Sequence, residues 1–320
     1  MSEVSEEIRD IGAKDAAYTV FSGFCMGSAD VVPGVSGGTM AVALGIYHRL
    51  LAAITSADKE AVISLLRFDL KKLFSRLHWR FLGALLVGVA VGIVVMVKGV
   101  KLPQLIAPDS PARTVVYALF FGMVLGSAGT LSRHLDQWTP GRYLAVVFGA
   151  GVGFGVVNLV PVDTPTHPVF IFFCGAIAIC AMLLPGISGS FILLILGKYA
   201  YILGALADLN LGVVLPFVAG CATGLLAFSR LLKWLLDHFQ DTMLATLIGL
   251  LLGSLWRIWP YQELTVKIVR EKPRVLGAEP FWPSGLDASV VVALLVGLAL
   301  VVGLEVYAAG KAQRAALDAG

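Results

Sequence analysis

Six long runs of uncharged, mostly apolar residues constrain the fold of this chain more than any other feature. They are residues 81–97, 114–132, 143–162, 210–229, 242–256 and 288–304. Each run is close to the roughly 20 residues that an α-helix needs to cross a bilayer. The chain is 58% hydrophobic and only 14% charged, whereas soluble domains carry about 25% charged residues. The sequence therefore predicts an all-α polytopic membrane protein, with residues 1–320 forming a single membrane domain.

Two further apolar stretches, residues 16–54 and 168–206, are nearly forty residues long and are interrupted in the middle. The interruptions are the pairs Pro33-Gly34 and Pro185-Gly186. Proline removes a backbone donor and disrupts a helix, so each pair is a predicted helix break. Each stretch is either two full spans or a re-entrant hairpin that returns to the side it entered from. The flanks are only about 17 or 18 residues long, close to the lower limit for a span, which favours the hairpin.

The two broken stretches are copies of each other. Residues 32–45 read VPGVSGGTMAVALG, and residues 184–197 read LPGISGSFILLILG. The similarity continues in the following spans as glycine pairs spaced by four: Gly88/Gly92 with Gly220/Gly224, and Gly122/Gly126 with Gly249/Gly253. Small residues at this spacing let membrane helices approach closely, so we expect these glycines to pack helices together. The shared order predicts two repeats, at about 16–162 and 168–308.

Each repeat contains one broken hairpin and three spans, so it crosses the membrane an odd number of times. The second repeat is then inverted relative to the first, as in many secondary transporters. Loops on the side of both termini carry twice as many Lys and Arg residues as loops on the other side, which predicts cytoplasmic termini. The loop 55–79 mixes basic and large apolar residues, which is typical of an amphipathic helix on the cytoplasmic surface.

Serine, threonine and glycine residues follow each Pro-Gly pair. The candidate binding residues are Ser36, Gly37, Gly38, Thr39, Ser188, Gly189 and Ser190. The first N–H groups of a helix have no helical partner and lie at the positive end of its dipole, and glycine lets a ligand approach the backbone. The pattern therefore predicts an anion site suited to phosphate, without lysine or arginine. The alternative is a pair of serine-capped helix starts whose glycines serve packing.

Asp30 lies just before the first break, where the second repeat has Met182. An ionisable residue inside a membrane is a functional candidate, so Asp30 could carry a proton or pair with a cation and couple transport to either. The alternative is that its carboxylate caps the following turn. Arg49, Lys198 and Arg257 lie near the ends of apolar runs, where long side chains are expected to extend to the interface.

No metal ion or other cofactor is expected. The four cysteines lie inside apolar stretches at spacings that match no metal site, so they are predicted to be free thiols. The net charge is only +3, and no basic cluster is interleaved with aromatic residues, which excludes nucleic acid as a partner.

The segment from Gly27 to Thr39, GSADVVPGVSGGT, and the segment from Leu184 to Ser190, LPGISGS, carry a family resemblance. The chain resembles, over roughly residues 16–308, the PopT polyprenyl-phosphate transporter family, formerly a domain of unknown function. The resemblance implies a flippase for undecaprenyl phosphate, the carrier lipid of bacterial cell-wall synthesis. Transport would run from the outer to the inner leaflet of the cytoplasmic membrane. The residues themselves indicate only a transporter with an anion site at two broken helices.

Two other functions fit parts of the same pattern. Membrane undecaprenyl-pyrophosphate phosphatases carry P-G-x-S-R-S-x-x-T, but both copies here have glycine in place of the arginine, at Gly37 and Gly189. No glutamate pair occurs in a span to act as base or metal ligand, so an enzyme is not expected. A small-anion channel or exchanger would also place glycine- and serine-rich helix ends inside the membrane. An opening for a long lipid tail would distinguish a lipid transporter from it.

Overall fold

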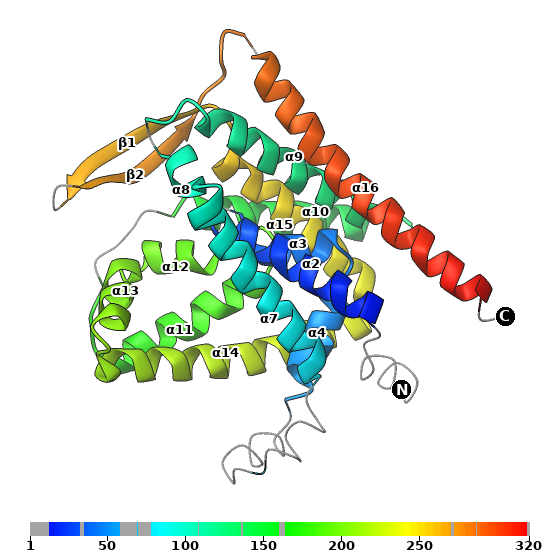
Figure 1. The fold of residues 1–320 in the computed structure, drawn as a ribbon, viewed down its shortest axis with the longest axis horizontal. Coiled ribbons are helices and arrows are strands. Elements are labelled where there is room, and N and C mark those ends of the chain that lie inside the picture. The colour runs from blue at the N-terminus through cyan, green and yellow to red at the C-terminus, as the bar shows by residue number, and fades with distance from the viewer. Residues whose placement is uncertain are drawn as a thin grey trace.

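A computed structural model describes residues 13–32, 35–57, 69, 78–107, 109–135, 137–159, 164–269, 272–285 and 287–318. The helices of the first half are α2 (Ala13–Asp30), α3 (Gly37–Ala43), α4 (Tyr47–Thr55), α7 (Trp79–Val94), η1 (Val95–Gly99), α8 (Leu102–Leu105), α9 (Arg113–Ser132) and α10 (Pro140–Val157). The second half contains α11 (Pro168–Leu183), α12 (Gly189–Ile195), α13 (Tyr199–Ala207), α14 (Leu211–His238), α15 (Gln240–Ser254), η2 (Leu255–Ile258) and α16 (Ala288–Asp318). Figure 1 shows this arrangement.

Six helical segments of the described chain are long and apolar enough to span a bilayer. They are Trp79–Gly99, Arg113–Ser132, Pro140–Val157, Leu211–His238, Gln240–Ile258 and Ala288–Val306. They coincide with the six runs identified in the sequence, so the prediction of an all-α polytopic membrane protein is confirmed. Two predicted features, the break at Pro33 and Gly34 and most of the loop 55–79, lie outside the described residues.

Each broken stretch contains a second break that the sequence analysis did not predict. The axes of α3 and α4 differ by 117°, and the corresponding bend between α12 and α13 is 110°. A glycine in the left-handed region forms each bend, Gly45 with φ +67° and Gly197 with φ +63°. Glycine adopts this conformation without steric cost.

The hydrogen bonds at the two bends are the same. Gly45 N–H donates to the Val42 carbonyl at 3.0 Å, and Ile46 N–H donates to the Ala41 carbonyl at 2.9 Å. Gly197 and Lys198 repeat the pattern with carbonyl partners at 3.0 and 2.8 Å. This is the Schellman motif, which satisfies the carbonyls at a helix end. The two halves therefore share this local structure as well as their sequence, while the re-entrant path stays a prediction.

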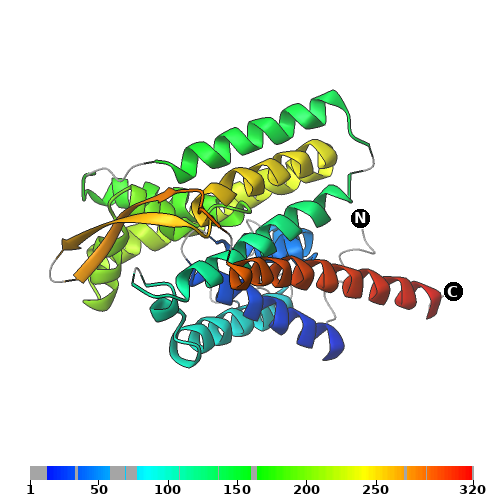
Figure 2. The same cartoon turned by 90° about the horizontal axis from the view of Figure 1, so that it is seen from above.

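The long helices pack in two kinds of pair, one within each half and one between the halves. α2 lies along α7, and α11 lies along α14, which are equivalent pairs in the two repeats. α9 lies along α16, and α10 lies along α15, so these pairs each take one helix from each half (Figure 2). This exchange of partners interlocks the two halves. It supports the predicted repeat, and the inverted orientation of the second half stays a prediction.

The predicted packing role of the spaced glycines is confirmed. A Cβ atom on Gly88 of α7 would lie 2.1 Å from the Val20 carbonyl oxygen in α2. A Cβ atom on Gly220 of α14 would lie 1.9 Å from the Phe172 carbonyl oxygen in α11. Both distances are far below van der Waals contact, so backbone meets backbone at these positions. The other six glycines, Gly92, Gly122, Gly126, Gly224, Gly249 and Gly253, face a neighbouring helix in the same way.

An antiparallel hairpin of β1 (Gln262–Val269) and β2 (Lys272–Pro280) connects η2 to α16, where the sequence analysis expected only a loop. It projects from one end of the helical bundle (Figures 1 and 2). The base of the hairpin is fixed to the bundle by side chains. Gln262 Nε2 donates to the Arg257 carbonyl at 2.7 Å, and Trp259 Nε1 donates to the Phe281 carbonyl at 3.0 Å.

The close contact of α2 and α7 gives a direct test of the packing. We expect Gly88→Ala to lower the stability by about 1–3 kcal/mol, the usual effect of overpacking a close contact. Gly83→Ala in the same helix is the matched control, because nothing lies within 4 Å of a Cβ atom at Gly83. The midpoint of thermal unfolding in detergent measures both variants. Equal midpoints for the two would contradict the packing described here.

Candidate functional site

The two broken stretches contact each other directly. Gly186 N–H donates to Thr39 Oγ1 at 2.9 Å, and the Tyr47 hydroxyl donates to the Leu183 carbonyl at 2.9 Å. Both bonds are buried and join residues more than 130 positions apart in the chain. In each bond, a side chain of the first stretch satisfies a backbone group beside the second break. The two broken stretches are therefore in contact at the second break, and the position of this contact at the membrane midplane stays a prediction.

The first motif is fully buried and caps its own helix. Ser36 is the N-cap of α3, and its Oγ accepts from Gly38 N–H at 3.1 Å. Ser36 and Thr39 both have 0% of their surface exposed. The three candidates Ser36, Gly38 and Thr39 are thus engaged in local or inter-stretch bonds.

Asp30 is positioned at the start of α3 by a hydrogen bond. Its Oδ1 accepts from Gly37 N–H at 2.7 Å. A Cβ atom at Gly37 would lie 2.7 Å from Asp30 Oδ2, so the missing side chain leaves room for the carboxylate. The capping interpretation of Asp30 therefore holds in this structure. The carboxylate occupies the position that an oxygen of a bound phosphate would take at this N–H group.

The second motif is more open. Ser190 is exposed, and its hydroxyl lies 2.8 Å from that of Ser188. No acceptor among the described residues bonds to the N–H groups of Gly189 and Ser190. A Cβ atom at Gly189 would lie 2.6 Å from the Ala178 carbonyl oxygen, so this glycine is needed for packing against α11. The two motifs therefore differ, with donors occupied in the first and free in the second.

The second break depends on a glycine. Gly186 has φ +86°, and a Cβ atom there would lie 2.8 Å from Ser254 Oγ. Pro185 beside it is buried. The predicted helix break is therefore present at this pair, held between α3 and α15.

Two cationic side chains that were expected to extend to the interface turn inward. Lys198 is only 4% exposed, and its Nζ donates to the Thr164 carbonyl at 2.5 Å. The Arg257 guanidinium lies over the Phe191 ring in α12, 5.0 Å from its centroid. Proximity to the end of an apolar run predicts an interfacial position, but the bend at Gly197 and the short η2 helix direct these side chains back into the protein.

An apolar groove with a volume of about 390 Å³ leads to Asp30 and Gly38. Its lining comes from α2, α3, α4, α7, α11 and α14, and includes Met26, Asp30, Gly38, Leu50, Leu85, Leu86, Met182 and Leu226. Among the described residues of the lining, Asp30 is the only charged one. Leu86 is 64% exposed, so the groove reaches the outer surface of the helices. A long apolar chain can thus extend from this surface to Asp30.

The four cysteines are free thiols, as predicted. Within the described part of the chain, no group of three or more His, Cys, Asp and Glu residues is placed to hold a metal ion. The polar chemistry of the site is therefore built from hydroxyls, backbone N–H groups and the Asp30 carboxylate.

Thr39→Val tests the hydrogen bond between Gly186 N–H and Thr39 Oγ1, which joins the two broken stretches. Valine keeps the shape of threonine but leaves the buried Gly186 N–H without an acceptor, which costs about 1–3 kcal/mol. We expect faster hydrogen exchange at Gly186 and a lower midpoint of thermal unfolding. Thr223→Val is the matched control, because the exposed Thr223 hydroxyl bonds only to a carbonyl of its own helix. Unchanged exchange at Gly186 in Thr39→Val would show that this bond does not hold the breaks together.

Comparison with known proteins assigns the chain to a family. A family model described as undecaprenyl phosphate translocase-like matches residues 26–275. A polyprenyl-phosphate transporter of Vibrio cholerae is 38% identical over 301 residues, which cover 91% of this chain and 96% of the relative. A polyprenyl-phosphate transporter of Staphylococcus aureus is 29% identical over 266 residues, covering 75% and 85%. No solved structure matches. The chain belongs to the undecaprenyl phosphate translocase-like family.

Proposed function

We propose that this protein is a flippase for undecaprenyl phosphate, with transport from the outer to the inner leaflet of the bacterial cytoplasmic membrane. We further propose that both termini of the protein are cytoplasmic, as the distribution of Lys and Arg in the loops favours. The family and the names of the two relatives support a polyprenyl phosphate as substrate. Such a lipid combines a phosphate head with a long apolar tail, so its path needs both a polar and an apolar part.

The groove that ends at Asp30 and Gly38 is the observation that carries this proposal. A small inorganic anion would gain no favourable contact from an apolar groove that opens on the lipid-facing surface at Leu86. An isoprenoid tail fills such a channel favourably, because burial of apolar surface contributes roughly 25 cal/mol per Å². The groove therefore favours a lipid transporter over a small-anion channel or exchanger.

The phosphate head requires polar partners inside the membrane. A charge that leaves water without new partners is strongly disfavoured. We assign its partners to Ser36, Gly37, Gly38 and Thr39 in the first motif and to Ser188, Gly189 and Ser190 in the second. The N–H groups of Gly189 and Ser190, which have no acceptor among the described residues, can donate directly to the phosphate oxygens. In the first motif the head would replace the Asp30 carboxylate at Gly37 N–H, so the lipid and the carboxylate compete for one donor.

The proposal includes no hydrolysis. Neither motif contains the arginine of the phosphatase pattern, and the relatives are named transporters. We propose that the lipid leaves with its phosphate monoester unchanged.

Reconstitution tests the proposed activity. Purified protein in liposomes that contain undecaprenyl phosphate should accelerate the exchange of the lipid between leaflets, followed with a head-group reagent that reacts only at the outer surface. Protein-free liposomes are the control, and an assay for inorganic phosphate follows hydrolysis in the same sample. Exchange at the protein-free rate would refute the transporter, and release of phosphate from undecaprenyl phosphate or its pyrophosphate would refute the absence of catalysis.

Asp30 is the candidate for coupling transport to protons or to the membrane potential. Asp30→Asn keeps an oxygen that accepts from Gly37 N–H but removes the ionisable group, so we expect a folded protein whose transport no longer responds to an imposed pH gradient. Asp208→Asn, at the exposed end of α13, is the control. If Asp30→Asn transports with an unchanged response to the gradient, Asp30 serves only as a helix cap.

A further inference from the structure

Two arginines lie where the hairpin joins the bundle, and neither forms an ion pair with a carboxylate of the described residues. Arg113 opens α9, and its guanidinium donates to the Ile106 carbonyl at 2.7 Å and to Gln262 Oε1 at 3.2 Å. It also lies over the Tyr117 ring at 4.5 Å from the centroid. These partners are all neutral, so the positive charge of Arg113 is not compensated by them.

Arg257 is the second member of this pair. Its guanidinium stacks over Phe191, and its electrostatic neighbours are Tyr117 and Arg113. Within the described part of the chain, no carboxylate lies within 4.0 Å of either arginine. An arginine side chain stays protonated in proteins, so two like charges repel each other in a partly buried site. A bound anion would relieve this repulsion.

One side chain bonds to the Arg113 guanidinium and to the backbone of Arg257. Gln262, the first residue of β1, accepts from Arg113 through Oε1 and donates to the Arg257 carbonyl through Nε2 at 2.7 Å. The hairpin base thus holds the N-terminus of α9 against η2. The alternative is that both arginines only pack over aromatic rings. That role would not require the hydrogen bonds with Gln262, although it is compatible with them.

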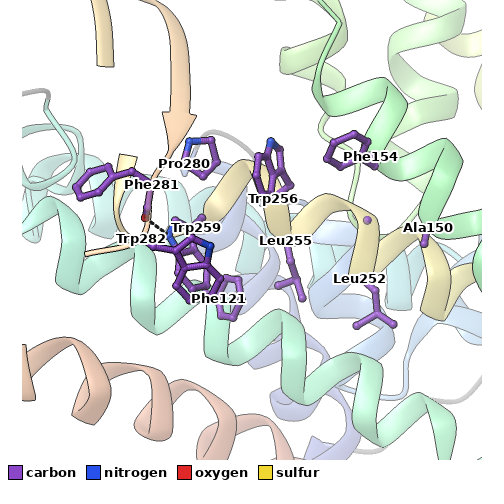
Figure 3. A pocket seen from close by; sticks show the side chains of 11 residues that line it. Phe121, Ala150, Phe154, Leu252, Leu255, Trp256, Trp259, Pro280, Phe281 and Trp282 are labelled. Atoms are coloured by element: carbon purple, nitrogen blue, oxygen red, sulfur yellow. Dashed lines mark hydrogen bonds between the residues drawn. The ribbon is translucent and has the colours of Figure 1, made fainter. Parts of the chain in front are cut away.

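An aromatic pocket with a volume of about 460 Å³ is lined by Phe121 of α9 and by Trp256 and Trp259, which lie on either side of Arg257 in the sequence (Figure 3). The rest of its described lining is also apolar and includes Phe154, Phe281 and Trp282. Trp256, Phe281 and Trp282 are 44%, 47% and 82% exposed. Exposed tryptophans are also typical of a membrane interface, so exposure alone does not distinguish a binding pocket from an anchor.

The arginine pair and the pocket share one face of α9. Arg113, Tyr117 and Phe121 follow each other at intervals of four residues, which places them one helical turn apart. The Arg113 guanidinium covers Tyr117, and Phe121 packs edge-on against Trp259 at 5.4 Å between centroids. Arg113 and Phe121 are eight residues apart, about 12 Å along the helix, with Tyr117 between them. This order matches a phosphate head followed by an apolar chain.

We propose that Arg113 and Arg257 bind the phosphate of a polyprenyl phosphate at the hairpin end of the protein, with the first isoprene units in the adjacent aromatic pocket. This loading site rests on the proposed function and adds to it, because it lies outside both serine- and glycine-rich motifs. Arginine suits the task, since its planar fork can donate two parallel hydrogen bonds to phosphate oxygens. Phe191 lies two residues after Gly189, so Arg257 also adjoins the second motif, to which the head would pass.

The test compares three probes by calorimetric titration into the purified protein: farnesyl phosphate, farnesol and inorganic phosphate. The proposal predicts that farnesyl phosphate binds more tightly than either of the others. Arg257→Gln and Arg113→Gln should each weaken its binding by about tenfold or more, as expected for the loss of a hydrogen bond to a charged group. Arg257→Lys should retain part of the affinity. Arg133→Gln is the matched control, because Arg133 is exposed at the opposite end of α9.

Three results would overturn the loading site. They are no binding of farnesyl phosphate by the wild type, equal binding by the wild type and a correctly folded Arg257→Gln variant, and equal affinity for inorganic phosphate. Transport of undecaprenyl phosphate by the same proteins separates this failure from failure of the proposed function. If the wild type transports and Arg257→Gln transports equally fast at low lipid density, the protein is a transporter without this site.

Discussion

The requirement that backbone polar groups find partners inside a membrane determines how this structure can contain broken helices. Neither lipid nor an apolar side chain can satisfy an N–H group or carbonyl that a break leaves free. Side chains of the first broken stretch therefore satisfy backbone groups of the second: Thr39 accepts from Gly186 N–H, and Tyr47 donates to the Leu183 carbonyl. Within each stretch the second bend is closed by its own Schellman motif. Helix pairs with backbone-to-backbone contact at glycines surround this centre and hold the two stretches in place.

The same requirement indicates which groups are available to bind a phosphate inside the membrane. At α3 the donor Gly37 N–H already has an anionic partner in Asp30, whereas at α12 the first donors have none among the described residues. The two repeats, similar in sequence, are thus unequal in chemistry. A lipid head that binds at the second motif, beside Arg257, and then competes with Asp30 at the first would move between the repeats. The apolar groove at Asp30 and the aromatic pocket near Arg257 offer its tail apolar surroundings at both places.

Much of this architecture could be predicted from the sequence, because its signals are local or repeated. Uncharged length predicted the six spans, and glycine spacing predicted the helix contacts. The bends at Gly45 and Gly197 were missed although both glycines are repeated, since a Leu-Gly pair does not reveal whether its glycine has positive φ. The hairpin was missed because its strands are short and rich in charged residues, unlike the long apolar runs around them. Capping by Asp30 was one of two alternatives, but its partner Gly37 N–H and the inward course of Lys198 and Arg257 depend on tertiary geometry, which periodicity does not contain.

The most direct test of this account is an experimental structure of the protein in lipid nanodiscs that contain undecaprenyl phosphate. The account predicts tail density in the groove between α4, α7 and α14, continuous with a phosphate within hydrogen-bonding distance of Gly37 N–H or of the Ser188–Ser190 segment. In a complex with the phosphate at Gly37, the Asp30 carboxylate should have moved away from that N–H group. A bound lipid whose head contacts neither motif, with the groove empty or filled by side chains, would contradict it.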